Sequence, residues 1–157
     1  MRVIYSDAEI TALIAEPKYF PGSGASLQLR QKRGHSEQHV ELESDSGADF
    51  ALVLRQNSQN QFDFSIILTV RPIGTASLFR LRRFNGRSHK HRNTIEGDVF
   101  FDFHIHTATE RYQRIGARED AYAEPTTQFA SFQSAWQFAV ADVNINSRAS
   151  GPTLPFP

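Results

Sequence analysis

The sequence predicts an α+β domain: a curved antiparallel sheet of about six strands, with a short N-terminal helix and an amphipathic C-terminal helix packed on one face. Two observations predict this fold. Between residues 27 and 105 apolar side chains alternate with polar ones, a period of two that is typical of strands with one buried face. At both ends of the chain the apolar spacing becomes helical. Short turns between the alternating segments favour antiparallel neighbours.

The N-terminal helix has a clear start and a clear end. Ser6 and Glu9 have the spacing of a capping box, in which each side chain satisfies a backbone N–H of the first helical turn. Apolar residues at helical spacing follow, and Pro17 ends the helix near Ala15 because the residue before a proline is disfavoured in helical conformation. We therefore expect one short helix that packs on the sheet by its apolar face.

The strands are predicted from alternation between turn-forming segments that contain glycine, proline or asparagine. The alternating segments are residues 27–30, 40–43, 50–55, 62–70, 79–82 and 99–105. The longest of them is residues 62–70, with apolar residues at every second position. Residues 99–105 form the last predicted strand.

Helical spacing returns in the final third of the chain. From Phe132 to Val143 apolar residues recur three and four positions apart, which predicts the amphipathic C-terminal helix. A shorter helix is expected over residues 109–115. We predict one domain over residues 1–146, followed by a flexible tail, residues 147–157, that is rich in proline and serine.

Composition limits the function classes. Seventeen basic and 17 acidic residues give no net charge, so any anion-binding property must come from how the charges are distributed. Without cysteine the chain forms neither disulfides nor thiolate zinc sites. There is no signal-peptide pattern and no apolar run of the ~18 residues that a membrane span needs. We expect a cytoplasmic protein without membrane contact.

The chemistry is expected around two His-x-His pairs, His89/His91 and His104/His106. They hold four of the six histidines, and residues 71–92 contain seven Lys or Arg without any Asp or Glu. If residues 99–105 form a strand, His104 and His106 share its polar face with Asp102. The strand before it then presents Arg80 and Arg82 beside them. The other two histidines lie next to glutamates, and we expect them to be structural.

Three chemistries fit these residues. In metal-independent phosphodiester cleavage, one histidine is the general base, another is the general acid, and Arg or Lys stabilises the developing charge. In a divalent metal site, the ligands come from His89, His91, His104 and His106 with Asp102. In simple binding, the basic stretch contacts phosphate or an acidic partner and no bond is broken.

The chain also resembles a family of uncharacterised bacterial and phage proteins, a domain of unknown function. The resemblance covers about residues 6–145 and rests on the pattern NGxxHxHxN (85–93), followed by FHIHxATERY (103–112). It implies no established activity. A weaker resemblance, carried by residues 88–91 and the strand order, is to TumE-like toxins of toxin–antitoxin pairs. It implies a growth-inhibiting protein that acts on RNA or translation.

Our leading hypothesis is a toxin-like protein that acts on RNA as a metal-independent ribonuclease, with no cofactor and no metal. His104 and His106 act as acid and base, and His89 or His91 assists. The residues predicted to bind phosphate are Arg80, Arg82, Lys90, Arg92 and Arg111. The expected partners are a nucleic acid or ribonucleoprotein, and a protein antitoxin or host defence complex. The alternative is a non-enzymatic phage or mobile-element inhibitor, such as an anti-CRISPR protein, that binds a macromolecule through its basic surface.

Overall fold

The computed structural model describes residues 3–21 and 30–147. Three helices lie within these ranges: α1 (Asp7–Ala15), α2 (Glu110–Arg114) and α3 (Phe132–Asp142). The strands are β1 (Lys18–Tyr19), β2 (Arg30–Lys32), β3 (His35–Ser44), β4 (Asp49–Asn57), β5 (Phe64–Arg71), β6 (Phe79–Asn85), β7 (His91–Arg92), β8 (Val99–Phe100), β9 (His104–Thr107), β10 (Ala123–Pro125) and β11 (Ile145–Asn146). Most of the first predicted strand and residues 148–157 of the predicted tail lie outside the described residues.

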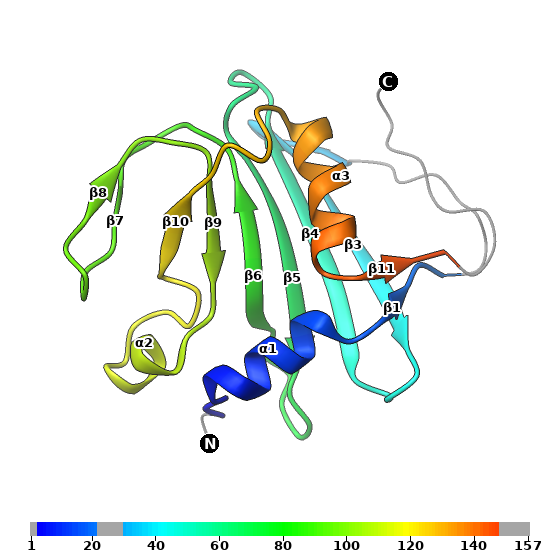
Figure 1. Ribbon diagram of the computed structural model, residues 1–157. Helices are drawn as coiled ribbons and strands as arrows, with labels where there is room; N and C mark the ends of the chain where they lie inside the picture. The colour runs from blue at the N-terminus through cyan, green and yellow to red at the C-terminus, as the bar shows by residue number, and fades with distance from the viewer. Residues whose placement is uncertain (1–2, 22–29, 148–157) are drawn as a thin grey trace.

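A large, curved and open sheet organises the fold (Figure 1). Its strand order is β10-β9-β6-β5-β4-β3-β1-β11, and β2 pairs additionally with β3. The long strands β3 to β6 form the antiparallel meander that the alternation predicted. The prediction of about six strands was wrong: eight strands run in continuous order. The extra ones, β1, β10 and β11, have only two or three residues, too few to show alternation.

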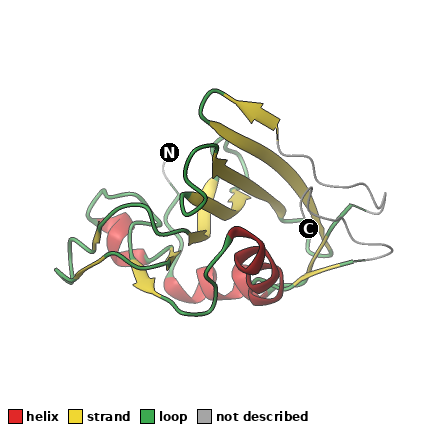
Figure 2. Cartoon of the chain, turned by 90° about the horizontal axis from the view of Figure 1, so that it is seen from above, coloured by secondary structure: helices red, strands yellow, loops and turns green. Residues whose placement is uncertain are grey.

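Helices α1 and α3 cover one face of the sheet (Figures 1 and 2), which confirms the α+β arrangement. The α1 capping box forms as predicted: Ser6 Oγ accepts from the Glu9 backbone N–H and Glu9 Oε1 accepts from the Ser6 backbone N–H. Helix α3 packs on the meander through aromatic contacts, for example Phe132 edge-on against Phe64 at 5.5 Å. Among the described residues, no helix has the length and apolar character needed to cross a membrane.

The last predicted strand, residues 99–105, is divided in two. Residues 101–103 are not strand, β8 pairs with β7 in a separate two-stranded sheet, and β9 pairs with β6 and β10. Asn85, the last residue of β6, already pairs with His104, so residues before His104 have no partner on β6. The chain therefore leaves the large sheet there, and Phe101 is exposed.

A register shift between Leu68 and Thr69 changes which arginines face the histidines. Arg80 pairs with Thr69 and Arg82 pairs with Leu68, so β6 has one more residue than β5 at this point. Such a bulge reverses the inward and outward alternation that follows. Arg82 is placed on the helix face, where its Nε lies 3.1 Å from an Asp142 carboxylate oxygen. The prediction that Arg82 shares a face with the histidines was therefore wrong.

Lys18 is a fully buried charge that connects the end of α1 with the end of α3. Its ammonium group donates to the carbonyls of Ile14, Glu16 and Val143 at 2.8–2.9 Å and lies 4.7 Å from the centre of the Phe50 ring. No described carboxylate forms an ion pair with it. Burial lowers the pKa of Lys18 to about 8. The three carbonyls, at the ends of α1 and α3, depend on this one donor.

We predict that Lys18→Met destabilises the protein by about 2–5 kcal/mol, because the buried carbonyls lose their donor. The unfolded chain keeps its proton up to about pH 10.5, whereas the folded chain releases it at about pH 8. Wild-type stability relative to the variant should therefore rise as the pH increases from 8 to 10.5. Urea unfolding across this range measures the difference. Lys90→Met, at an exposed position, is the control, and equal stabilities of all three proteins would contradict the prediction.

Candidate functional site

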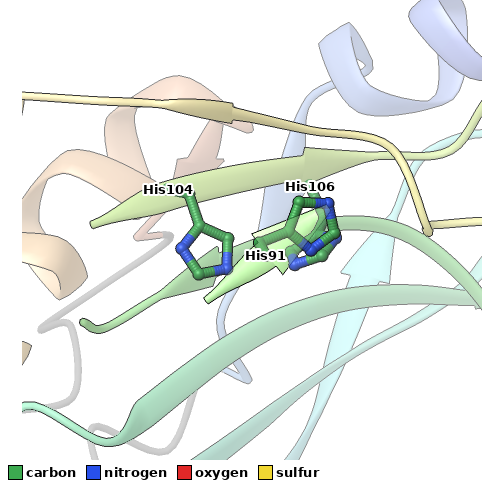
Figure 3. Close-up of side chains that lie close together, drawn as sticks. All are labelled: His91, His104 and His106. Carbon is green, nitrogen blue, oxygen red and sulfur yellow. The ribbon is translucent and has the colours of Figure 1, made fainter. Parts of the chain in front are cut away.

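Three histidines from two strands meet on the sheet face opposite α1 and α3. His104 and His106 come from β9 and His91 from β7, and one nitrogen of each ring lies within 4.8 Å of the others (Figure 3). The centre of the His91 ring lies 5.5 Å from that of His104 and 4.9 Å from that of His106. Three of the four predicted histidines are thus brought together.

Backbone carbonyls fix the tautomers of the two β9 histidines. The Nδ1 atom of His104 lies 2.8 Å from the Asp102 carbonyl oxygen, and that of His106 lies 2.7 Å from the Asp120 carbonyl oxygen. A carbonyl can only accept, so each Nδ1 must carry the hydrogen. In the neutral ring the lone pair then sits on Nε2. Asp102 therefore contributes its backbone, whereas the sequence analysis proposed its carboxylate.

The tautomer of His91 is fixed by Asn93, which is itself held in one orientation. Ala123 donates its N–H to Asn93 Oδ1 at 2.9 Å, and its carbonyl accepts from Asn93 Nδ2 at 2.8 Å. The amide oxygen thus faces His91 Nε2, at 2.8 Å. Because that oxygen is an acceptor, His91 Nε2 carries the hydrogen and Nδ1 keeps the lone pair.

Burial keeps the two β9 rings neutral. It lowers the pKa of His104 to about 4, with further lowering by repulsion from His91 and His89. Burial also lowers the pKa of His106 to about 4, with repulsion from His104 as the next cause. At neutral pH both rings are therefore acceptors on the side that does not face a carbonyl. The cluster brings lone-pair nitrogens together where a cation or a water could bind.

Asn85 lies next to this cluster and has an unsatisfied oxygen. It pairs with His104 across β6 and β9, and its Nδ2 lies 3.5 Å from His104 Nε2, a long contact for a hydrogen bond. Its Oδ1 is buried and has no hydrogen-bond partner among the described residues. A buried acceptor of this kind is costly unless a ligand or water donates to it.

A pocket of about 430 Å³ opens beside the cluster. Its lining includes His91 and His106, together with His89 from the loop after β6. Four arginines and two aspartates also line it: Arg55, Arg83, Arg92, Arg118, Asp63 and Asp120. Apart from the histidines, these side chains carry four positive and two negative charges. The pocket is therefore positive by two charges.

The other predicted site residues between β6 and the end of β7 face the solvent. His89 is exposed, with its ring centre 6.3 Å from that of His104, and its Nδ1 lies 3.1 Å from the Ser88 hydroxyl. Lys90 and Arg92 are exposed as well. Of these predicted residues, His89 and Arg92 line the pocket and Lys90 does not.

The other predicted phosphate ligands each face one acidic group. Arg80 pairs with Glu119 at 3.1 Å, and Arg82 lies on the helix face with Asp142. Arg111 lies 3.4 Å from a Glu96 oxygen, with its guanidinium 4.6 Å from the Tyr122 ring centre. None of these three arginines lines the pocket beside the histidines. The apparent excess of positive charge in residues 71–92 is thus partly compensated by acids from later in the chain.

Sequence reasoning missed five residues around the cluster: Arg83, Asn85, Asn93, Arg118 and Asp120. The first two were assigned to no site because the bulge that turns them toward the histidines leaves no signal in the alternation. Asn93 and Asp120 act through contacts with segments distant in sequence. Only Asn85 and Asn93 had a signal, since both belong to the pattern NGxxHxHxN.

Comparison with known proteins identifies the family. A family model described as "Family of unknown function (DUF6978)" matches residues 5–145. The chain belongs to this family. No curated protein and no solved structure matches the chain. The histidine cluster, Asn85 and Asn93 all lie inside the span that the DUF6978 model matches.

We predict that Asn93→Ala destabilises the protein by about 2–4 kcal/mol, since the buried N–H and carbonyl of Ala123 lose their partners. His91 should also lose its fixed tautomer. Denaturant unfolding measures the first effect, and long-range ¹H–¹⁵N NMR of the imidazoles measures the second. Gln61→Ala, at an exposed amide, is the control. Wild-type spectra with His91 protonated on Nδ1 would contradict the tautomers derived above.

Proposed function

We propose that this DUF6978 protein is a metal-dependent hydrolase whose divalent transition-metal ion, of the zinc class, is bound by His91 Nδ1, His104 Nε2 and His106 Nε2. The observation that carries the proposal is the outer hydrogen bond on each ring. Metal-binding histidines characteristically donate their other N–H to a carbonyl or carboxylate, which fixes the tautomer and orients the lone pair. Here Asp102, Asp120 and Asn93 provide all three acceptors.

The donor set and its spacing fit such an ion. Zinc–nitrogen bonds of about 2.0–2.1 Å in a tetrahedral site place ligand nitrogens about 3.3 Å apart. The present separations, within 4.8 Å, require a closure of at most about 1.5 Å. His91 lies on the small β7–β8 sheet, so a shift of that sheet toward β9 would bring its ring closer to the two β9 rings. Three neutral imidazoles suit zinc, cobalt, nickel or iron better than magnesium or calcium, which prefer oxygen ligands.

Three protein ligands leave a fourth position open, the arrangement of catalytic rather than structural zinc sites. A zinc-class ion bound there would lower the pKa of a bound water toward neutrality and so supply a nucleophile. The role of the chain is to orient that water and move its proton. Asn85 Oδ1 can accept one hydrogen of the water, which would satisfy the buried oxygen. His89, exposed at the pocket edge, is placed to take up a proton.

Metal-independent RNA cleavage by a toxin-like protein is the second candidate. The exposed Lys90 and Arg92 favour contact with a nucleic acid or ribonucleoprotein, and a protein antitoxin would then be a natural partner. This mechanism needs one protonated imidazole as general acid. The low pKa values of His104 and His106 make these two rings poor general acids at neutral pH. A cytoplasmic location, which the absence of cysteine favours, is part of this proposal.

The alternative of a non-enzymatic inhibitor, such as an anti-defence protein, uses the same exposed cations without chemistry. It predicts that loss of the histidine cluster leaves partner binding unchanged. The hydrolase proposal predicts instead that loss of the histidine cluster abolishes the hydrolytic activity.

Cleavage of total cellular RNA separates these candidates. Metal-stripped protein, the same protein with one equivalent of Zn²⁺, and a zinc-treated His91→Ala variant are compared, with His39→Ala as a matched surface control. Cleavage that requires zinc and His91 supports the metal-dependent hydrolase. Cleavage by stripped protein supports acid–base catalysis without metal. Zinc-loaded protein that cleaves no RNA contradicts RNA as the substrate, and no activity on a panel of phosphate, ester and amide substrates would overturn the hydrolase proposal.

A further inference from the structure

We propose that Arg83 and Arg118, both held by the buried carboxylate of Asp120, form a phosphate-binding arm beside the three-histidine cluster. The substrate of the site is then a phosphate ester. This inference deepens the proposed function and rests on it in one respect: the bound metal ion would supply the remaining contact to the phosphate.

The arm is attached directly to the cluster. Arg83 is the cross-strand partner of His106, so the two side chains leave the same face of the sheet about 5 Å apart at their Cβ atoms. Asp120 connects the cluster to the arm: its backbone carbonyl accepts from His106 Nδ1, and its carboxylate binds the two arginines. Arg83, Arg118, Asp120 and His106 line the same pocket.

One carboxylate orients two guanidinium groups. Arg83 places Nε and one terminal nitrogen 3.0 Å from Asp120 Oδ2, and Arg118 places Nε 2.9 Å from Oδ1. Asp120 is only 1% exposed, so the geometry is built into the fold. The other terminal nitrogen of Arg83 and both terminal nitrogens of Arg118 have no hydrogen-bond partner among the described residues. Oriented guanidinium donors of this kind are suited to bind phosphate oxygens.

The charge balance favours an anion with more than one negative charge. Two arginines on one aspartate leave one positive charge in the arm. Arg55, opposed only by Asp63 at 3.5 Å, adds none, and the exposed Arg92 adds another. A divalent ion on the histidines would raise the local charge further. A phosphate ester offers several oxygens to two guanidinium groups and a metal ion at once, whereas a carboxylate offers two.

The arm is distinct from the arginines that the sequence singled out. Arg80 and Arg82 pair with Glu119 and Asp142, and neither lines the pocket. The arginines expected to bind the substrate are therefore Arg83 and Arg118, which share one carboxylate partner.

The test uses zinc-loaded full-length protein, with zinc content measured on every sample. Inorganic phosphate, a mononucleotide and a short single-stranded RNA are the probes, measured by isothermal titration calorimetry. Arg118→Gln, at a half-exposed side chain, should fold normally and weaken phosphate binding about tenfold, and Arg83→Gln should weaken it further. Arg71→Gln, at a partly exposed arginine paired with Asp49, is the matched control and should bind as wild type. Tighter binding of the nucleotide or of RNA than of phosphate identifies which ester the site takes.

The outcomes separate the two proposals. If the variants and wild type hold equal zinc and bind phosphate equally well, the arm is overturned and the metal site stands. If wild type holds zinc but binds none of the probes, the arm is likewise overturned. If the wild-type protein holds no zinc, and either arginine substitution nevertheless lowers the affinity for phosphate, the arm is supported and the metal proposal fails.

Discussion

His104→Ala is expected to lower the zinc affinity of the protein by about 100-fold or more, because it removes one of three ligands whose outer partners alone typically contribute 10- to 100-fold. The buried ring has no substitute: its Nδ1 is bound to the Asp102 carbonyl, so Nε2 is the nitrogen that keeps a lone pair for a metal ion. Saturating zinc should therefore raise the unfolding temperature of wild type and raise that of the variant by much less. Competition with a chromophoric chelator measures the affinity.

His39→Ala is the matched control for this substitution. His39 is exposed on β3, and among the described residues the hydrogen-bond partner of its ring is the Glu37 carboxylate, at 3.2 Å. Its replacement should leave zinc affinity and the zinc-dependent temperature shift intact. If both histidine variants bind zinc as wild type does, His104 is not a ligand.

Gly86→Ala is expected to destabilise the protein by about 3 kcal/mol or more, because no space exists for a methyl group at this position. An added Cβ would clash with the Phe62 carbonyl oxygen, and would lie 2.8 Å from the Phe62 carbonyl carbon and 2.9 Å from a Phe64 ring carbon. The clash is with backbone, so β6 or the turn before β5 must move. Glycine is needed here for close approach of two backbones.

The same substitution should affect the proposed metal site. Gly86 follows Asn85 and opens the segment that leads to His91, and its N–H donates to the Phe64 carbonyl at 3.0 Å. Displacing it should weaken zinc binding as well as stability. Denaturant unfolding and chelator competition measure both. Ser88→Ala, two residues further along the same segment, should change stability by less than about 0.5 kcal/mol. A Gly86→Ala variant as stable as wild type would contradict the close packing at Gly86.

The fold was largely predictable because its long elements carry local signals. The capping box at Ser6 and the helical spacing from Phe132 predict α1 and α3, and the alternation predicts β3 to β6. The two- and three-residue strands gave no signal of their own. β1 and β11 pair with each other through Lys18 and Ile145, which are far apart in the sequence. Such pairing depends on tertiary packing, which no local pattern encodes.

The histidines of the candidate site were predictable from the sequence, and the residues around them were not. The period of two placed His104 and His106 on the polar face of their strand, opposite Ile105, and the structure confirms this. That His91 joins them while His89 stays exposed depends on the small β7–β8 sheet, and residue spacing does not encode that pairing. A single bulge in β6 exchanged Arg82 for Arg83 beside His106. A one-residue shift of this kind reverses every later assignment on a strand.

X-ray absorption spectroscopy of the zinc-loaded protein tests the central claim most directly. The account predicts one zinc ion per chain, with three imidazole nitrogens at about 2.0–2.1 Å and one light-atom ligand from water completing a tetrahedral shell. The imidazole signal should fall by one ring in His91→Ala and remain unchanged in His39→Ala. A spectrum of oxygen ligands alone, or full imidazole coordination in His91→Ala, would contradict the three-histidine site.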